Sequence, residues 1–315
     1  MPVEARPSCS SRIALPERIR PLYAFESHFL DLGGICLHYL DEGLGEPVLL
    51  LHGNPSWSFM YRDLIRALRT DRRVIAPDHV GCGLSSRPSE ERYTYTLSRR
   101  LADLETLIDS LDLPGPLSLV LHDWGGLIGM AFAVRHPERI ARIVLLNTAG
   151  FRVPDGGSLH WTIRFCRRSR IGAFLMTYFN AFARGACRLG SARGMSAAVR
   201  GGYLAPYRSV RDRLAVTRFV QDIPLQCGDP AFEIVDETER GLGRLRDRRL
   251  MICWGDRDFV FNEAFLMKWL DYFPDADVHR FSEAGHYVLE DAADDLIPLI
   301  KEFLRDGPSG SERVA

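Results

Sequence analysis

Five short runs of apolar residues, separated by helical patterns, constrain the fold more than any other feature of this sequence. They span residues 47–53, 73–78, 117–123, 141–147 and 249–256. Apolar and polar residues do not alternate within them, which is typical of strands covered on both faces, as in a parallel sheet. Between the second and third runs, leucine and isoleucine recur over residues 97–111 on one face of a predicted amphipathic helix. This alternation predicts an α/β fold with a mostly parallel, doubly wound sheet.

Two segments of the sequence depart from this rhythm. Residues 25–32 and 35–40 alternate apolar with polar side chains and meet at Gly33-Gly34, which predicts an antiparallel hairpin at one edge of the sheet. Residues 151–234 lack strand patterns and carry aromatic, helix-compatible pieces. We interpret them as a helical cap over the carboxyl edge of the sheet, where such folds bind ligands. The predicted domains are a first core part (22–150), the cap (151–234) and a second core part (235–306).

The overall composition excludes several classes of protein. A net charge of −1 over 315 residues gives no reason to expect nucleic acid as a partner. No apolar run is long enough to span a bilayer, and the first 25 residues do not read as a signal peptide. The seven cysteines are scattered without CxxC spacing, so we expect reduced thiols, no structural metal and a cytoplasmic location.

The stretch "LHDWGG", residues 121–126, places a carboxylate where a predicted strand turns sharply into a helix. A helix N-terminus favours negative charge, and Gly125 allows the turn to be tight. Asp123 alone could be an ordinary helix N-cap. It could instead be a nucleophile, because an aspartate, unlike a serine, is already anionic at neutral pH. Such a nucleophile would attack a saturated carbon and form an ester that a histidine-activated water then hydrolyses.

Two partners favour the nucleophile. His286, in "SEAGHYVLED", precedes the last predicted helix and would be the base; Asp258, in "WGDRDFVF", follows a predicted strand and would orient it. Their chain order, nucleophile then acid then histidine, is that of the α/β-hydrolase fold. Asp256 is a rival for the orienting acid.

The loop "LHGNPSWS" adds donors beside the nucleophile. The backbone N–H groups of Asn54 and Trp124 would form an oxyanion hole, and their side-chain N–H groups could bind a leaving halide or carboxylate. The alternative is that Asn54 only stabilises its loop and Trp124 only packs. No residue pattern indicates a cofactor or a metal.

These motifs resemble the haloalkane dehalogenases of the α/β-hydrolase superfamily. The resemblance rests on "HGNPSWSFMYRDL", "PDHVGCGLSSRP", "HDWGG" and "AGHYVLED". It implies that Asp123, His286 and Asp258 are nucleophile, base and acid, and that Asn54 and Trp124 hold the halide. One dehalogenase subgroup carries its acid after the preceding strand, where this chain has Asn147.

The longer match, "NTAGF" with "FPDADVHRFSEAGHYVLEDA", resembles the third dehalogenase subgroup, which overlaps enzymes that convert β-lactones to long-chain alkenes and carbon dioxide. The resemblance therefore implies a dehalogenase acting on a small apolar substrate or, alternatively, a β-lactone decarboxylase. The same residues would serve both reactions.

Three other functions fit less well. Epoxide hydrolases share "HDWGG" but need cap tyrosines, for which Tyr178, Tyr203 and Tyr207 are available, and typically have an aromatic residue where this chain has Asn54. Fluoroacetate dehalogenases have arginine in place of Trp124. A non-catalytic homologue would have no need of the complete triad.

The run "RFCRRSR", residues 164–170, is strongly basic. We interpret it as a solvated helix face of the cap. The alternative is a docking surface for other enzymes of a pathway or for membrane head groups.

Overall fold

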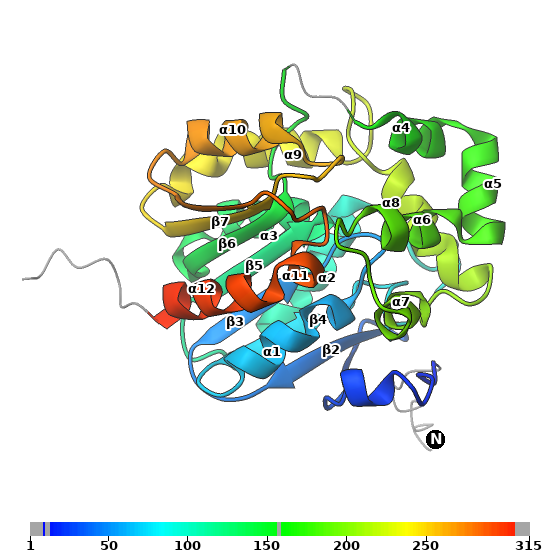
Figure 1. Ribbon diagram of the computed structural model, residues 1–315, viewed down its shortest axis with the longest axis horizontal. Coiled ribbons are helices and arrows are strands. Elements are labelled where there is room, and N and C mark those ends of the chain that lie inside the picture. The colour runs from blue at the N-terminus through cyan, green and yellow to red at the C-terminus, as the bar shows by residue number, and fades with distance from the viewer. Residues whose placement is uncertain (1–8, 10–12, 156–158, 306–315) are drawn as a thin grey trace, which may run out of the picture.

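The computed structural model describes residue 9, residues 13–155 and residues 159–305, and within these residues eight strands form one sheet (Figure 1). Their order across the sheet is β1-β2-β4-β3-β5-β6-β7-β8. The strands are β1 (His28–Asp31), β2 (Cys36–Glu42), β3 (Pro47–Leu51), β4 (Arg73–Pro77), β5 (Leu117–Asp123), β6 (Ile140–Thr148), β7 (Arg249–Gly255) and β8 (Asp277–Phe281).

The strand pairing matches the predicted architecture. β2 is antiparallel to both β1 and β4, and every other neighbouring pair from β4 to β8 is parallel. The β1–β2 turn uses positive φ angles at Gly33 (75°) and Gly34 (85°), which glycine adopts without steric cost. The predicted α/β fold, with its edge hairpin and mostly parallel sheet, is confirmed.

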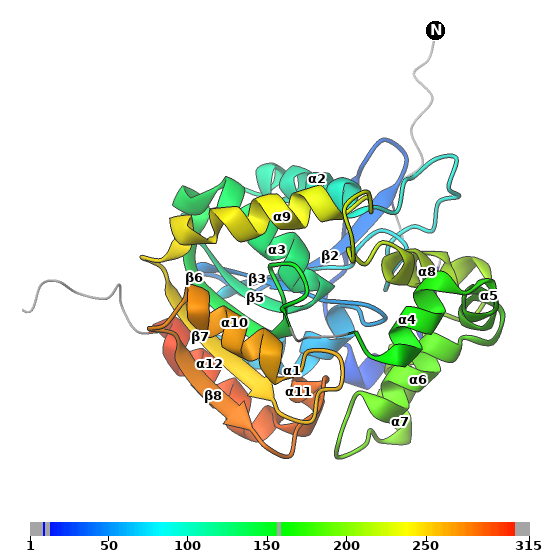
Figure 2. The ribbon, with the colours of Figure 1, turned by 90° about the horizontal axis from the view of Figure 1, so that it is seen from above.

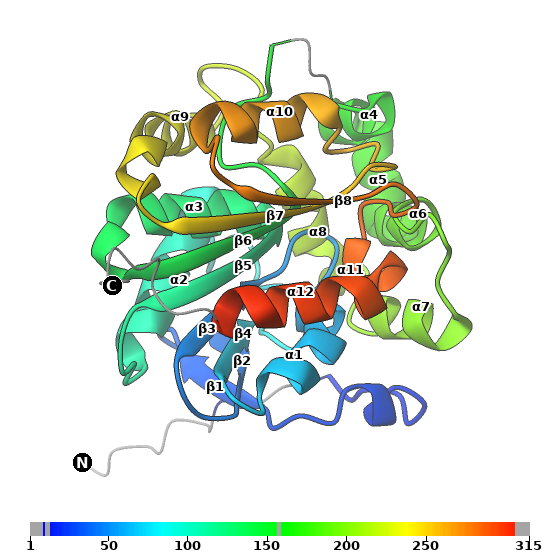
Figure 3. The ribbon, with the colours of Figure 1, turned by 60° about the vertical axis from the view of Figure 1, so that its left-hand side comes forward.

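Helices cover both faces of the sheet (Figure 3). On one face α2, α3, α9 and α10 share a core with the sheet, and on the other α1, α11 and α12 share a second core. These helices are α1 (Arg62–Leu68), α2 (Leu97–Ser110), α3 (Trp124–Arg135), α9 (Phe232–Gly241), α10 (Glu263–Tyr272), α11 (Val288–Asp291) and α12 (Ala293–Arg305). Short 3-10 helices are η1 (Arg20–Leu22), η2 (Ser58–Tyr61), η3 (Pro137–Arg139), η4 (Arg211–Arg213) and η5 (Leu242–Leu245).

Five further helices lie together beyond the carboxyl ends of the central strands, on the right in Figures 1 and 2. They are α4 (Trp161–Arg168), α5 (Arg170–Phe179), α6 (Ala181–Leu189), α7 (Ala197–Leu204) and α8 (Leu214–Gln221). We call them the cap helices. Helix α9 packs against α3 of the core. The domain boundaries at residues 151 and 234 stay a prediction, and residues 156–158 and 306 lie outside the described residues.

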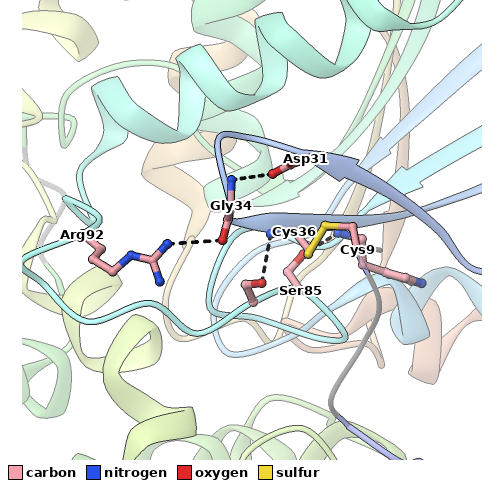
Figure 4. Close-up of a disulfide and its surroundings, with 8 residues drawn as sticks. Cys9, Asp31, Gly34, Cys36, Ser85 and Arg92 are labelled. Carbon is pink, nitrogen blue, oxygen red and sulfur yellow. Dashed lines mark hydrogen bonds between the residues drawn. A yellow bond between two sulfur atoms is a disulfide. The ribbon is translucent and has the colours of Figure 1, made fainter. Parts of the chain in front are cut away.

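One cysteine pair differs from the expectation of reduced thiols. Cys9 is joined by a disulfide to Cys36 at the start of β2, beside the β1–β2 turn (Figure 4). Their Cα atoms are 5.6 Å apart, a distance that a disulfide bridges readily. The other five cysteines are free. The spacing of the cysteines in the sequence could not predict this pair, because the two residues are 27 positions apart.

Among the described residues, no helix is both long and apolar enough to cross a membrane.

Candidate active site

The candidate nucleophile lies on a strained turn. Asp123 is the last residue of β5, and α3 begins at Trp124. Its backbone has φ 50° and ψ −123°, a conformation that non-glycine residues rarely adopt. The turn can be this tight because Gly125 has no Cβ atom. A Cβ atom at this position would lie 1.9 Å from the carbonyl oxygen of Leu51 and would clash with it. The strand, the turn and the helix thus hold the Asp123 side chain at the carboxyl edge of the sheet.

Backbone N–H groups bind the Asp123 carboxylate. The N–H of Asn54 donates to Oδ1 at 2.6 Å, and the N–H of Trp124 also donates to this side chain. Burial raises the pKa of Asp123 above its ordinary value of 3.8, although the charge of His286 and these two N–H groups oppose the shift. Because Oδ1 accepts the Asn54 N–H, Oδ2, which lies 3.9 Å from His286 Nε2, is the oxygen left to react.

His286 lies between the two aspartates. Its Nδ1 is 2.9 Å from Asp258 Oδ2, and its Nε2 is 3.9 Å from Asp123 Oδ2. Burial lowers the pKa of His286, but the charge and hydrogen bond of Asp258 outweigh it, so the pKa lies above 6.5. The other oxygen of Asp258 accepts the N–H of Val260 at 2.7 Å, which fixes the carboxylate. The rival acid, Asp256, is exposed and pairs with Arg280 at 2.9 Å.

The two side-chain donors differ in their bonding. The Asn54 amide donates one N–H to the carbonyl oxygen of Val216 at 3.1 Å, which leaves its second N–H. The indole N–H of Trp124 has no hydrogen-bond partner among the described residues, and its ring packs against Phe219 with centroids 5.2 Å apart. Both residues line the same cavity as Asp123 and His286. This arrangement can hold an anion close to the carboxylate.

The cavity is apolar away from these four residues. It measures about 420 Å³, within the range of about 300–1,000 Å³ typical of small-molecule sites. Its walls come from the core and the cap helices and include Leu127, Phe151, Phe182, Ile223, Phe261 and Phe265.

The tyrosines that an epoxide hydrolase would need lie elsewhere. Among the described residues, no tyrosine lines the cavity. The hydroxyl of Tyr203 donates to Glu290 at 2.7 Å, that of Tyr207 donates to the carbonyl oxygen of Ser56, and Tyr178 is exposed. Within the described part of the chain, no tyrosine hydroxyl is therefore placed to protonate an epoxide oxygen.

Three supporting residues were missed by sequence reasoning. His122 Nε2 donates to the carbonyl oxygen of His286 at 2.8 Å. Burial and the nearby charge of His286 keep the pKa of His122 well below its usual value.

Asp291 accepts backbone N–H groups of Gly285 and Ala192, which ties the His286 loop to the cap. A Cβ atom on Gly53 would lie 2.1 Å from Asp123 Oδ1. The only feature of the sequence that could have indicated these residues is their position within or next to the motifs of the site.

Asn147, where one dehalogenase subgroup carries its acid, has a structural role in this chain. Asn147, at φ 39°, donates to the carbonyl oxygen of Gly255 at 3.0 Å and accepts its N–H at 2.8 Å. The Asn147 side chain thereby joins the carboxyl ends of β6 and β7. Elsewhere, the described residues contain no group of three or more His, Cys, Asp or Glu side chains that could hold a metal ion.

The chain is similar to known enzymes over most of its length. A cis-3-alkyl-4-alkyloxetan-2-one decarboxylase of Shewanella oneidensis is 47% identical over 90% of each chain. One of Xanthomonas campestris is 42% identical over 91% of this chain and 99% of its own. A haloalkane dehalogenase of Mycobacterium bovis is 34% identical over 89% of this chain and 96% of its own.

The fold also matches a solved structure. A haloalkane dehalogenase from Agrobacterium tumefaciens superposes with a TM-score of 0.79 at 24% identity, covering 89% of this chain and 97% of that one. The family model described as the alpha/beta hydrolase fold matches residues 46–293. The chain is therefore an α/β-hydrolase-fold enzyme and belongs to the family whose relatives are haloalkane dehalogenases and oxetanone decarboxylases.

Proposed function

We propose that this enzyme decarboxylates a cis-3-alkyl-4-alkyloxetan-2-one, a β-lactone with two alkyl chains, to an alkene and carbon dioxide. The observation that carries the proposal is the 47% identity, over 90% of both chains, to a relative named for that activity, against 34% for the dehalogenase. The site supports it, because a carboxylate and unpaired N–H donors meet at an apolar cavity suited to alkyl chains.

The first step would open the strained ring. Asp123 Oδ2 attacks the saturated ring carbon that is bonded to the ring oxygen. A carbon–oxygen bond to Asp123 forms as the bond between that carbon and the ring oxygen breaks. The electron pair passes to the ring oxygen, which becomes part of a free carboxylate. The Trp124 indole N–H and the second Asn54 amide N–H would stabilise this new anion, because such donors act strongly in a dry site.

The second step would release both products. The bond between the new carboxylate and the neighbouring carbon breaks, and its electron pair forms the carbon–carbon double bond. The ester bond to Asp123 breaks at the same time, so the aspartate regains its electron pair. Attack with inversion followed by elimination in an anti geometry would give the cis alkene. Neither step consumes water, and the carboxylate is regenerated.

His286 and Asp258 would act on the charge of Asp123 in this reaction. Asp258 favours the protonated imidazole, whose charge lies 3.9 Å from the Oδ2 atom of Asp123. That charge opposes the rise in the Asp123 pKa caused by burial and so keeps the nucleophile ionised.

The second candidate function is hydrolytic dehalogenation of an apolar haloalkane. The 34% identity to a haloalkane dehalogenase favours it, as do two side-chain donors that could hold a halide. Asp123 would displace the halide and form an alkyl ester. His286 would then remove a proton from water, which attacks the ester carbonyl and releases an alcohol.

Offering a cis-3,4-dialkyl oxetan-2-one and a bromoalkane separately to one preparation tests both candidates. We expect stoichiometric cis alkene and carbon dioxide from the lactone, with slower bromide release from the bromoalkane. Asp123→Asn is the matched control, because it keeps the side-chain shape and removes the charge. Bromide release without alkene would overturn the decarboxylase and support the dehalogenase. Alkene formation by Asp123→Asn at the wild-type rate would overturn the decarboxylase mechanism, and bromide release by it at the wild-type rate would overturn the dehalogenase mechanism.

We propose that the enzyme needs no cofactor, because the two reaction schemes balance with Asp123, His286 and, for the dehalogenase, water alone. We propose a small apolar substrate because the cavity is lined by apolar side chains, and a cytoplasmic location because five of the seven cysteines are free.

A further inference from the structure

Exposed apolar side chains are concentrated on one part of the surface. Among the described residues, eleven large hydrophobic side chains are exposed, and eight of them lie in cap helices α4, α5 and α6. We call these eight residues the apolar cap face; they are Trp161, Phe165, Ile171, Phe174, Leu175, Tyr178, Phe179 and Leu189. Helix α5 is the outermost helix on that side of the molecule in Figures 1 and 2. A clustered apolar surface of this kind marks an interaction site.

The same part of the chain is uniformly basic. Residues 156–211 contain ten arginines and no lysine, aspartate or glutamate, so the rest of the chain holds 30 basic and 41 acidic residues. The protein is close to neutral overall, but its cap is strongly positive and its core is negative. The electrostatic field of such a charge distribution orients the protein with its cap toward an anionic surface.

The exposed arginines of α4 to α6 are free to bind such a surface. Arg164, Arg168, Arg170, Arg184 and Arg188 are exposed and form no ion pair with a described residue. Arg167 provides the contrast, because it is half-buried, faces inward and pairs with Asp229 at 2.6 Å. The inward arginine has an acidic partner within the protein, and the outward ones lack one among the described residues.

The apolar cap face is continuous with the cavity of the active site. Trp161, Phe165, Leu175 and Leu189 are exposed and also line that cavity. The route from the protein surface to Asp123 is therefore bordered by apolar side chains. An apolar molecule could move along it without passing through water.

We propose that helices α4, α5 and α6 dock on the surface of a membrane containing anionic lipids. Aromatic and aliphatic side chains beside arginines, without acidic residues, are the composition of helices that lie in a lipid interface. The apolar cap face enters the boundary between head groups and acyl chains, and the arginines bind lipid phosphates while their methylene stems cover apolar surface. The cavity then receives its substrate from the bilayer. This proposal does not depend on which reaction Asp123 performs.

Vesicle flotation of the full chain tests the proposal. Vesicles of phosphatidylglycerol and phosphatidylcholine are compared with vesicles of phosphatidylcholine alone, at about 0.15 M salt. One variant combines Arg164→Gln, Arg168→Gln and Arg188→Gln, and a second combines Ile171→Ser, Phe174→Ser and Phe179→Ser. The matched control combines Arg240→Gln, Arg244→Gln and Arg246→Gln, which removes the same charge from exposed residues of α9 and the segment that precedes β7. Melting temperatures and turnover of a short, water-soluble substrate establish that each variant is folded.

We expect the wild type and the control to bind the anionic vesicles, with little binding to phosphatidylcholine alone. The arginine variant should bind roughly 100-fold more weakly, because each arginine near an anionic surface contributes a severalfold gain in partitioning. The serine variant should bind at least about 10-fold more weakly. The proposal is overturned if the wild type does not float with anionic vesicles, or if either cap variant binds as the wild type does. Retention of the wild type on immobilised poly-glutamate without binding to vesicles would also overturn it, in favour of an acidic protein partner.

Discussion

Replacing Asp258 by asparagine is the most informative single perturbation of the site, because the structure fixes how the new amide must lie. Asp258 Oδ1 accepts the N–H of Val260 at 2.7 Å, and Oδ2 faces His286 Nδ1 at 2.9 Å. In Asp258→Asn the amide oxygen must stay at Val260, so the NH₂ group faces the imidazole. His286 Nδ1 then has to accept, and its proton moves to Nε2. That nitrogen can no longer take a proton from water.

The cost follows from the same contacts. Reversing the amide would leave the Val260 N–H facing another donor, a loss of about 1–3 kcal/mol. Losing the negative charge beside the imidazolium of the transition state removes a charged hydrogen bond, which contributes about 1.5–3 kcal/mol. Together these losses come to roughly 4 kcal/mol, or about 1,000-fold in rate. The related replacement in serine-protease triads costs about 10⁴-fold.

Intact-mass spectrometry after a pulse of bromoalkane measures this effect directly. The alkyl ester on Asp123 should form in Asp258→Asn and decay about 1,000-fold more slowly than in the wild type. Asp256→Asn is the matched control, because Asp256 pairs with Arg280 on the surface, and its ester should decay at the wild-type rate. Decay in Asp258→Asn within tenfold of the wild type would refute the assignment of Asp258 as the orienting acid.

The remaining predictions concern the nucleophile and its donors. Gly53→Ala should lower turnover at least about 100-fold with the fold retained, because the added Cβ would lie 2.1 Å from Asp123 Oδ1; wild-type kinetics would contradict this. Trp124→Phe should slow departure of the leaving group about 100-fold, since it removes the unpaired indole N–H and keeps the ring, and unchanged pre-steady-state rates would exclude that role. Asn54→Ala should slow the same step. The rate of alkylation should fall as the pH falls through the pKa of Asp123, which lies above 3.8. The rate of ester hydrolysis should rise as the pH rises through the pKa of His286, which lies above 6.5. Midpoints of the two pH–rate profiles at or below these values would show that the site does not raise either pKa. Turnover of a lactone in H₂¹⁸O should leave Asp123 unlabelled, whereas hydrolysis of the alkyl ester formed from a haloalkane should label it.

The sheet could be predicted from the sequence because each strand carries its own signal. Strands β3 to β7 are runs of apolar residues buried on both faces, and the hairpin of β1 and β2 is marked by Gly33-Gly34. β8 (Asp277–Phe281) is half-exposed at the sheet edge and lacks such an apolar run. The place of the cap over the carboxyl edge of the sheet was predicted, but the number of cap helices and their packing on one another were not, because these depend on contacts between segments far apart in the chain.

The candidate site was predictable where the function depends on residue type and chain order. Asp123, Asp258 and His286 come from three separate loops, and the structure brings them together. The hydrogen bond between the Asn54 side chain and Val216 was not predictable, since it joins residues 162 positions apart. The same holds for the disulfide of Cys9 with Cys36 and for the contact between His122 and the carbonyl oxygen of His286.

A covalent bond between Asp123 and a substrate carbon is the central claim, and peptide mapping of an alkylated variant tests it most directly. His286→Ala retains the nucleophile and lacks the base, so treatment with a bromoalkane should leave a stable adduct of one alkyl group. Fragmentation should place that group on Asp123 in the peptide containing "LHDWGG". An unmodified mass despite demonstrated binding of the bromoalkane, or an alkyl group on any other residue, would contradict the account.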